Sequence, residues 1–455
     1  MPRERTNQSI TPEDALSVAA LDQINDPLTK SSPFISSAGL VNALTKPSIL
    51  AILWAGVFAH LWKLFETLGD RVYRWDFSLY YLTSYAQAHG LNPYTTDLTP
   101  LARGLHLSPG MPGGNFLDLP VMMIAMEPLT WLSVPAAYWT WFAINVVALA
   151  LALFLLLRGH PAMQPRFLLA WLALAFLHPS VGMHFYYAQS QILVLLMLVL
   201  IMRWTERDRG AAAGLMFGLA SILRAYPQAL ACYFIVRRNW RALIYGAIAM
   251  AACFALTVAV AGLEPWRGFL LQLSVHTVDD HSGSPANVAL VHTVSRFLAV
   301  IIGDGTAFSL QITRLLAATF ANLAIVMISL KVTADSWRRP DDDWRVYSLW
   351  VVTMLLVSPV TWVHSLILLL LPFAKLTIAA VEGRASRRAM WMAVVSYAMI
   401  SLASGWHQSV GTYDTNQLSA WVAELSPLSL IAAYISVYWF ATDRDFPVAE
   451  SAVAA

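Results

Sequence analysis

The amino-acid sequence predicts an all-α polytopic membrane protein, and three observations support this class. Of its 455 residues, 58% are hydrophobic and 12% are charged, whereas soluble domains carry roughly 25% charged residues. Apolar runs recur after residue 45, and the longer ones reach the roughly 20 residues that cross a hydrocarbon core. These runs are continuously apolar rather than alternating, which excludes the strands of a membrane β-barrel. Because backbone groups in lipid must pair internally, we expect helices.

Both ends of the chain differ from this apolar middle. Residues 1–45 are polar, carry proline and serine, and lack the apolar core of a signal peptide, so we predict a disordered cytoplasmic tail. Residues 443–455 are predicted to form a second cytoplasmic tail, and residues 46–442 the transmembrane domain between the two tails. A net charge of +2 gives no global basic field that would indicate a nucleic-acid partner.

The basic residues predict the orientation of the chain, because those beside spans stay on the cytoplasmic side. The basic clusters fall between apolar runs, at residues 158–166, 203–209, 237–241, 331–345 and 384–388. The intervening connections are expected to face outward, with a first loop at 70–135, a second at 262–304, and shorter ones at 358–364 and 405–418. We therefore expect the functional residues on the outer face of the plasma (inner) membrane.

The apolar runs predict about twelve membrane spans. The separate runs lie near residues 49–68, 136–157, 167–185, 189–202, 243–261, 307–330, 346–357, 365–380, 389–403 and 420–441. Segments 211–223 and 226–236 are short for spans and are expected to form a tight, broken helical pair. The stretch 116–134 is broken by Pro120 and Pro128, so we expect it to lie along or partway into the outer face.

The first outward loop begins with an acid at the membrane interface. From residue 77 to 88, apolar and aromatic residues recur at roughly helical spacing, which predicts an amphipathic helix on the outer leaflet. Asp76 directly precedes this segment, and an acid at such a position commonly caps a helix N-terminus. The functional alternative is a carboxylate that accepts the proton of an incoming hydroxyl beside a lipid-accessible cavity.

Several short motifs follow one another along the chain and together carry a family resemblance. They are WDFSLYY at 75–81, HGLNPY at 89–94, YAQSQ at 187–191, LRAYP at 223–227, NVAL at 287–290 and SPVTWVH at 358–364. In this order they resemble the motifs of glycosyltransferase family 87, which includes polyprenyl-phosphate-mannose-dependent α-mannosyltransferases. YAQSQ reproduces the family's Gly-Gln-Val-Asn segment only in part.

The resemblance implies a fold, a reaction and a set of substrates. Members of the family have the GT-C fold, with an acid of the first outward loop as the catalytic base, and Asp76 matches that position. The implied donor is a polyprenyl monophosphate sugar, most often mannose, and the implied acceptor is a lipid or a glycan on the outer face. Transfer would proceed by inverting single displacement, and this donor class implies no cofactor and no metal.

Other motif residues match positions that would bind the donor. Arg224 stands where the family usually has lysine, and its charge would bind the donor phosphate, although an arginine there could instead snorkel to the interface. His364 could donate to phosphate or sugar, or simply make boundary contacts. Trp362 could stack on a sugar face, or belong to the aromatic belt of the membrane. The remaining donor-binding candidates are Tyr226, Gln191 and Asn287.

The second outward loop contains residues of the types that bind metals. His276, Asp279, Asp280 and His281 lie close together in the sequence, but their serine, glycine and proline neighbours indicate a flexible loop. We therefore expect no metal. The acidic triplet 341–343 lies beside arginines on the predicted cytoplasmic side and is expected to form a solvated charged loop.

Three functions are compatible with an outward site that binds a lipid phosphate. The first is a hexosyltransferase that uses a polyprenyl-phosphate sugar. The second is a transporter or flippase that moves a lipid-linked sugar without making a bond, and such a protein should carry gating residues on both faces. The third is a ligase that transfers a whole glycan and usually has several arginines in its outward loop, whereas residues 262–304 contain only Arg267 and Arg296. The outward position of the candidate residues favours the transferase.

Overall fold

The computed structural model describes residues 43–73, 75–108, 118–160, 164–279, 287–302, 308–337, 343–410, 422 and 424–443. Every regular element within these ranges is helical, and the extended pairing found there is an isolated bridge between Asn287 and Trp362. The prediction of an all-α chain is confirmed. The predicted tails, 1–45 and 443–455, lie outside the described residues apart from 43–45 and 443.

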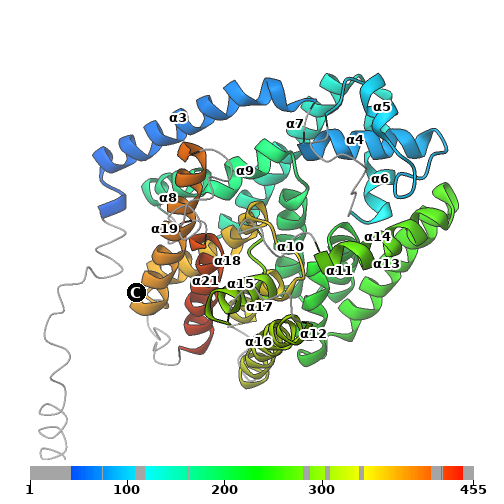
Figure 1. Cartoon of the computed structure of the whole chain (residues 1–455). Coiled ribbons are helices and arrows are strands. Elements are labelled where there is room, and N and C mark those ends of the chain that lie inside the picture. The colour runs from blue at the N-terminus through cyan, green and yellow to red at the C-terminus, as the bar shows by residue number, and fades with distance from the viewer. Residues whose placement is uncertain are drawn as a thin grey trace, which may run out of the picture.

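The helices form one bundle (Figure 1). The longer ones are α3 (Pro47–Arg71), α7 (Val134–Leu157), α13 (Trp240–Ala261), α16 (Phe308–Asp335), α19 (Arg387–Val410) and α21 (Leu425–Thr442). The shorter ones are α4 (Trp75–Ala88), α5 (Thr99–Gly104), α6 (Pro120–Met126), η1 (Glu127–Trp131), α8 (Pro165–Leu177), α9 (Pro179–Tyr187), α10 (Gln191–Thr205), α11 (Gly210–Leu223), η2 (Tyr226–Ala229), α12 (Leu230–Val236), α14 (Glu264–Asp279), α15 (Leu290–Ile302), α17 (Asp343–Val357), η4 (Val363–Leu369) and α18 (Leu370–Val381). Figure 1 shows α3 along one side and α4, α5 and α6 gathered at one end.

Six helices in the described part of the chain are long and apolar enough to cross a membrane. They are Pro47–Gly69, Val134–Leu157, Trp240–Ala261, Leu315–Asp335, Val363–Val381 and Leu425–Thr442. The pair α8 and α9, bent by 50°, gives a seventh candidate. Other expected spans correspond to apolar helices of 10–17 residues, including α10 and α11. A polytopic membrane protein is supported, and the count of about twelve spans stays a prediction.

Several of the short helices end where proline or a polar junction interrupts the chain. The bent pair is divided by His178, and α9 begins at Pro179. Ala188 then adopts a left-handed backbone with φ of 52°, which turns the chain toward α10. α11 ends before Arg224, whose backbone is extended, and Pro227 lies in the short η2 that follows. Irregular backbone within a membrane is tolerated where it packs against protein or lines a polar cavity. We therefore expect the functional site at these junctions.

Burial separates a central segment from peripheral ones. The most apolar window of Val363–Val381 is 89% buried, against 11% for Pro47–Gly69 and 17% for Trp240–Ala261. The peripheral helices expose large apolar side chains such as Phe58, 68% exposed, and Phe320, 66% exposed. An apolar exterior of this extent indicates a surface that faces lipid rather than water.

The segment 70–135, predicted to be the first outward loop, contains several short elements that pack together. The stretch expected not to cross the membrane forms α6, with 7 residues, and η1, with 5, both too short to span a bilayer. The predicted helix after Asp76 is present as α4, which packs against α6 and η1. Residues 77–84 of α4 are all buried, including Ser78, Thr83 and Ser84. Its position as an amphipathic helix on a leaflet stays a prediction.

Helices α11 and α13 approach each other closely because glycines line their contact. A Cβ atom on Gly214 would lie 2.4 Å from the carbonyl oxygen of Ala242, and one on Gly218 would lie 2.4 Å from that of Gly246. Small residues at such contacts let helix backbones pack directly against each other. The contact fixes α11, and the chain continues from its C-terminal end into Arg224.

We expect Gly214→Ala to force α11 away from α13 and to lower the stability by about 1–3 kcal/mol, as overpacking does. Thermal unfolding of the purified protein in detergent would measure the loss. Gly69→Ala is the matched control, because no atom lies within 4 Å of a Cβ placed at that exposed helical position. An equal loss in both variants would contradict the role assigned to the glycine contact.

Candidate active site

Asp76 belongs to the first turn of α4, which begins at Trp75. A carboxylate in the first helical turn is stabilised by the partial positive charge of the helix N-terminus. The Oδ2 atom of Asp76 accepts a hydrogen bond from Nε2 of Gln189, a residue at the junction between α9 and α10. The carboxylate is therefore tied to a second element of the bundle, beyond any capping of its own helix.

Arg224 lies at the break between α11 and η2, and its guanidinium makes contacts with several elements. Nε donates to Ser190 Oγ at 3.1 Å. Nη2 donates to Tyr80 Oη and to Gln189 Oε1, each at 2.7 Å. Nη1 forms an ion pair with the carboxylate of Asp118, which directly precedes the N-cap residue of α6. This arrangement holds Arg224 among protein groups, so the expected alternative of snorkelling is not what the structure shows.

Gln189 links the acid and the guanidinium into one network. Its Oε1 atom accepts hydrogen bonds from Tyr80 Oη, at 2.8 Å, and from Arg224, while its Nε2 atom donates to Asp76. Both ends of the amide are therefore used, which fixes its orientation. The network joins α4, the α9–α10 junction, the α11–η2 junction and the segment before α6.

The environment of Asp76 raises the pKa of its carboxyl to about 7, mainly through burial and secondly through the negative charge of Asp118. The charge of Arg224 and the hydrogen bond from Gln189 offset part of this rise. Burial also raises the pKa of Asp118, against the lowering effect of Arg224. Both acids lie outside the candidate membrane spans. A carboxyl group with a pKa near neutrality suits a general base at physiological pH.

A second group of predicted residues lies on the loops that precede α15 and η4. Oδ1 of Asn287 accepts hydrogen bonds from the backbone N–H groups of Ala289, at 3.2 Å, and Thr361, at 3.1 Å. The N–H of Val288 donates to the carbonyl oxygen of Thr361 at 2.7 Å, so the two loops are held together. Nδ2 of Asn287 is buried without a hydrogen-bond partner among the described residues. This N–H group is available to a ligand oxygen.

The other predicted residues line the same end of the bundle. His364 is 8% exposed, and its ring lies 5.9 Å from that of Tyr187 at the end of α9. Trp362 is half-buried and is bridged to Asn287. Gln191 begins α10, and its Oε1 atom is buried without a partner in the described part of the chain. Tyr226 begins η2, two residues after Arg224, and is buried.

The structure thus joins Asp76 and Arg224 in one hydrogen-bonded network and pairs Asn287 with Trp362. His364 and Tyr226 interact electrostatically with Arg224 and therefore lie near this network. Sequence reasoning missed three members of the network, and these are Tyr80, Gln189 and Asp118. Tyr80 and Gln189 stand inside motifs that had been noticed, whereas an isolated acid in the apolar stretch 116–134 was the signal for Asp118.

The metal prediction can be tested only in part. The side chains of His276, Asp279, Asp280 and His281 lie outside the described set. Among the side chains that are described, no group of three or more histidine, cysteine, aspartate or glutamate residues could hold a metal ion. The absence of a metal therefore stays a prediction.

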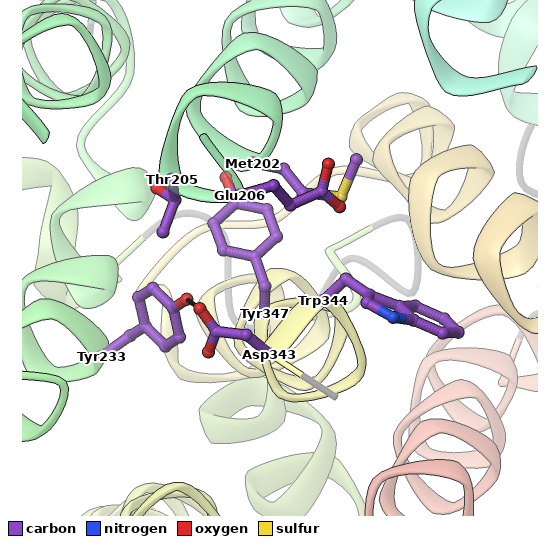
Figure 2. Close-up of a pocket in the computed structure, with 7 residues that line it drawn as sticks. All are labelled: Met202, Thr205, Glu206, Tyr233, Asp343, Trp344 and Tyr347. Carbon is purple, nitrogen blue, oxygen red and sulfur yellow. Dashed lines mark hydrogen bonds between the residues drawn. The ribbon is translucent and has the colours of Figure 1, made fainter. Parts of the chain in front are cut away.

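A second cluster of charged side chains, of which Lys375 is buried, lies at the opposite ends of the helices that lead to the network. α10 runs from Gln191 to Thr205, where Glu206 pairs with Lys375, which is 3% exposed. Asp343, the first residue of α17, accepts a hydrogen bond from Tyr233 at 2.7 Å and pairs with Arg237. Figure 2 shows a small pocket that Glu206 and Asp343 line together with the rings of Tyr233, Trp344 and Tyr347. The solvated loop expected at 341–343 is therefore wrong for Asp343, and charged groups are not confined to one end.

The fold and the network define an all-helical membrane protein with a carboxylate held near a buried guanidinium. The family model of glycosyltransferase family 87 matches residues 116–359, more than half of the chain, and the protein belongs to this family. The resemblance drawn from the motifs is confirmed, and the protein is a membrane glycosyltransferase. The matched region contains Asp118, Gln189 and Arg224, while Asp76 lies before it.

Two curated relatives are similar to most of the chain. The polyprenol-phosphate-mannose-dependent alpha-(1-2)-phosphatidylinositol mannoside mannosyltransferase of Mycobacterium tuberculosis is 25% identical over 318 residues, which cover 67% of this chain and 69% of the relative. The protein of the same name from Mycolicibacterium smegmatis is 25% identical over 374 residues, which cover 78% of each chain.

We expect Arg224→Met to lower the stability by about 3 kcal/mol, because it leaves the buried carboxylate of Asp118 without its counter-charge. Adding Asp118→Leu should recover most of this loss, since replacing both partners removes the uncompensated charge. Thermal unfolding in detergent of the two single variants and the double variant gives the coupling between the sites. The control is Arg267→Met, whose ion pair with Glu264 is 71% and 67% exposed at its two side chains and should contribute little. Additive losses at Asp118 and Arg224 would contradict the pairing.

Proposed function

We propose that the protein transfers a hexose, and specifically mannose, from a polyprenyl-phosphate sugar to a lipid or glycan acceptor on the outer face of the plasma membrane. Both relatives are named as polyprenol-phosphate-mannose-dependent enzymes that act on phosphatidylinositol mannoside. The observation that carries the proposal is the hydrogen-bonded connection from Asp76 through Gln189 to Arg224. It holds a base and a phosphate-binding cation in one site.

The reaction is an inverting single displacement. Asp76 removes the proton of the acceptor hydroxyl while the oxygen attacks the anomeric carbon from the face opposite the phosphate. The bond between the anomeric carbon and the phosphate oxygen breaks, and its electron pair leaves with the polyprenyl phosphate. The proton then passes from Asp76 to water, which restores the carboxylate. No further reactant is needed to balance the step.

Arg224 supports the departure of the phosphate. As the bond breaks, negative charge grows on the phosphate oxygen, and a prearranged cation stabilises it more strongly in a water-poor site than in solution. A guanidinium presents its N–H groups as a planar fork that matches two phosphate oxygens. Its contacts with Tyr80, Gln189 and Ser190 hold the fork in place before the donor binds.

The remaining predicted residues would hold the sugar and the phosphate. The buried Nδ2 of Asn287 and Oε1 of Gln191 lack partners among the described residues, and sugar hydroxyls can satisfy both a donor and an acceptor. Trp362 offers an aromatic face for a sugar ring, and His364 and Tyr226 offer polar groups at the same end of the bundle. We assign these five residues to donor binding.

The transporter alternative has one observation in its favour. A protein that moves a lipid-linked sugar across the membrane would need charged groups at both ends of the bundle, and the cluster around Glu206 and Lys375 supplies them at the second end. The ligase alternative is disfavoured, because residues 262–304 contain two arginines, Arg267 and Arg296, where such a ligase usually has several.

We expect purified wild type in detergent to transfer radiolabelled mannose from synthetic polyprenyl-phosphate-mannose to a total lipid extract. Asp76→Asn should fold normally and lose about 100-fold or more of the rate, as expected when a general base is removed. Asp97→Asn is a matched control, because Asp97 is an exposed acid of the same loop. Full activity in Asp76→Asn would overturn the mechanism. Binding of the donor without transfer by wild type would favour the transporter.

We expect kcat/KM for the donor to rise with pH and to level off above about 7, because the base acts in its deprotonated form and the pKa of Asp76 is raised to about 7. The profile should be measured from pH 5.5 to 8.5 under conditions where the protein remains folded. A profile that is flat across this range would show that no group with such a pKa controls the reaction.

A further inference from the structure

The anion that Arg224 now binds belongs to the protein itself. Its contacts with Ser190, Tyr80 and Gln189 are to neutral groups, and its ion pair is with Asp118. The side chains of this pair are 19% exposed for Arg224 and 12% exposed for Asp118. A guanidinium at this depth requires a counter-charge, and Asp118 supplies it.

The main chain of Asp118 is fixed by a hydrogen bond, whereas its carboxylate can move away from Arg224. The hydroxyl of Tyr94 donates to the carbonyl oxygen of Asp118 at 2.6 Å, which fixes the main chain directly before Leu119 and α6. The carboxylate, which also interacts with Tyr80, can leave Arg224 by rotation about its side-chain bonds, without movement of the segment.

The donor phosphate and Asp118 require the same part of the guanidinium. Nε and Nη2 of Arg224 are engaged by groups that orient the fork, whereas Nη1 is engaged by the carboxylate. A phosphate bound to two N–H groups of the fork would meet the negative charge of Asp118 at that position. Two anions cannot share this side of the guanidinium without strong repulsion.

We propose that Asp118 is a positioning residue that pairs with Arg224 before the donor binds and releases the guanidinium to the donor phosphate. The inference rests on the proposed function, because it takes Arg224 as the phosphate-binding group. Donor binding is then an exchange of one anion for another, and Arg224 is never left without a counter-charge. The affinity for the donor is set by the difference between these two ion pairs.

Asp118 also acts on the candidate base, which supplies a second and independent readout. Its negative charge raises the pKa of Asp76, against the charge of Arg224. The other groups that interact electrostatically with Asp118 are Tyr80, Tyr94 and Tyr226. Removing the charge of Asp118 should therefore lower the pKa of Asp76 and move the acidic limb of kcat/KM to lower pH.

The test compares wild type with Asp118→Asn, which keeps the size of the side chain and the backbone carbonyl that Tyr94 binds. The probe is radiolabelled polyprenyl phosphate, whose equilibrium binding requires no turnover. If the carboxylate occupies Arg224 about nine-tenths of the time, its removal tightens the Kd roughly tenfold. The acidic limb of kcat/KM should move to lower pH in the same variant.

The inference would be overturned if Asp118→Asn bound the probe no more tightly than wild type and the acidic limb of its kcat/KM profile did not move. Asp118 would then serve only to hold Arg224 in position. Should this variant fail to fold, Tyr94→Phe tests the same idea, because it loosens Asp118 while keeping both charges. A Kd that tightens by a smaller factor supports the exchange, and one that is unchanged or weaker refutes it. Failure of the proposed function is recognised separately, by wild type that binds the probe and transfers no sugar.

Discussion

The positive charge of Arg224, buried among apolar helices, is the constraint around which the surrounding structure is organised. An unpaired charge at such a depth costs several kcal/mol, so folding must bring it polar partners. The partners come from three other places in the chain, namely α4, the α9–α10 junction and the segment before α6. The hydrogen bonds and the ion pair of one guanidinium therefore fix the relative positions of elements more than 100 residues apart in the sequence. One of these elements, α4, carries Asp76.

The all-helical class could be predicted from the sequence because it follows from composition and from the demands of lipid on the backbone. The expected breaks near Arg224 and Pro227 are present, since proline and an isolated charge act locally. The lengths of the helices between breaks could not be predicted, because α10 and α11 are held by their neighbours as much as by their own hydropathy. The contact of Gly214 with α13 depends on which helices meet.

Some residues of the candidate site could be predicted from the sequence and others could not, for a similar reason. Motif order identified Asp76 and Arg224, yet the residue that connects them is Gln189, while Gln191, two positions later, had been chosen. Asp118 was overlooked because its stretch was interpreted only for its apolar character. The cluster around Lys375 was missed because this lysine lies inside the apolar run 365–380, and its pairing with Glu206 depends on which helices meet.

The short helices and their polar junctions bear on how the chain enters the membrane during synthesis. Each segment is judged by its own hydrophobicity when it leaves the translocon, and an arginine near the middle of a segment disfavours insertion by about 2.5–3.5 kcal/mol. α11 has 14 residues and is followed at once by Arg224, so together with η2 and α12 it makes a poor independent insertion signal. The glycine contact with α13, a strongly apolar helix of 22 residues, gives this region a neighbour with which to insert. Integration of the segments that carry the guanidinium is therefore cooperative, and the order in which helices are released contributes to assembling the site.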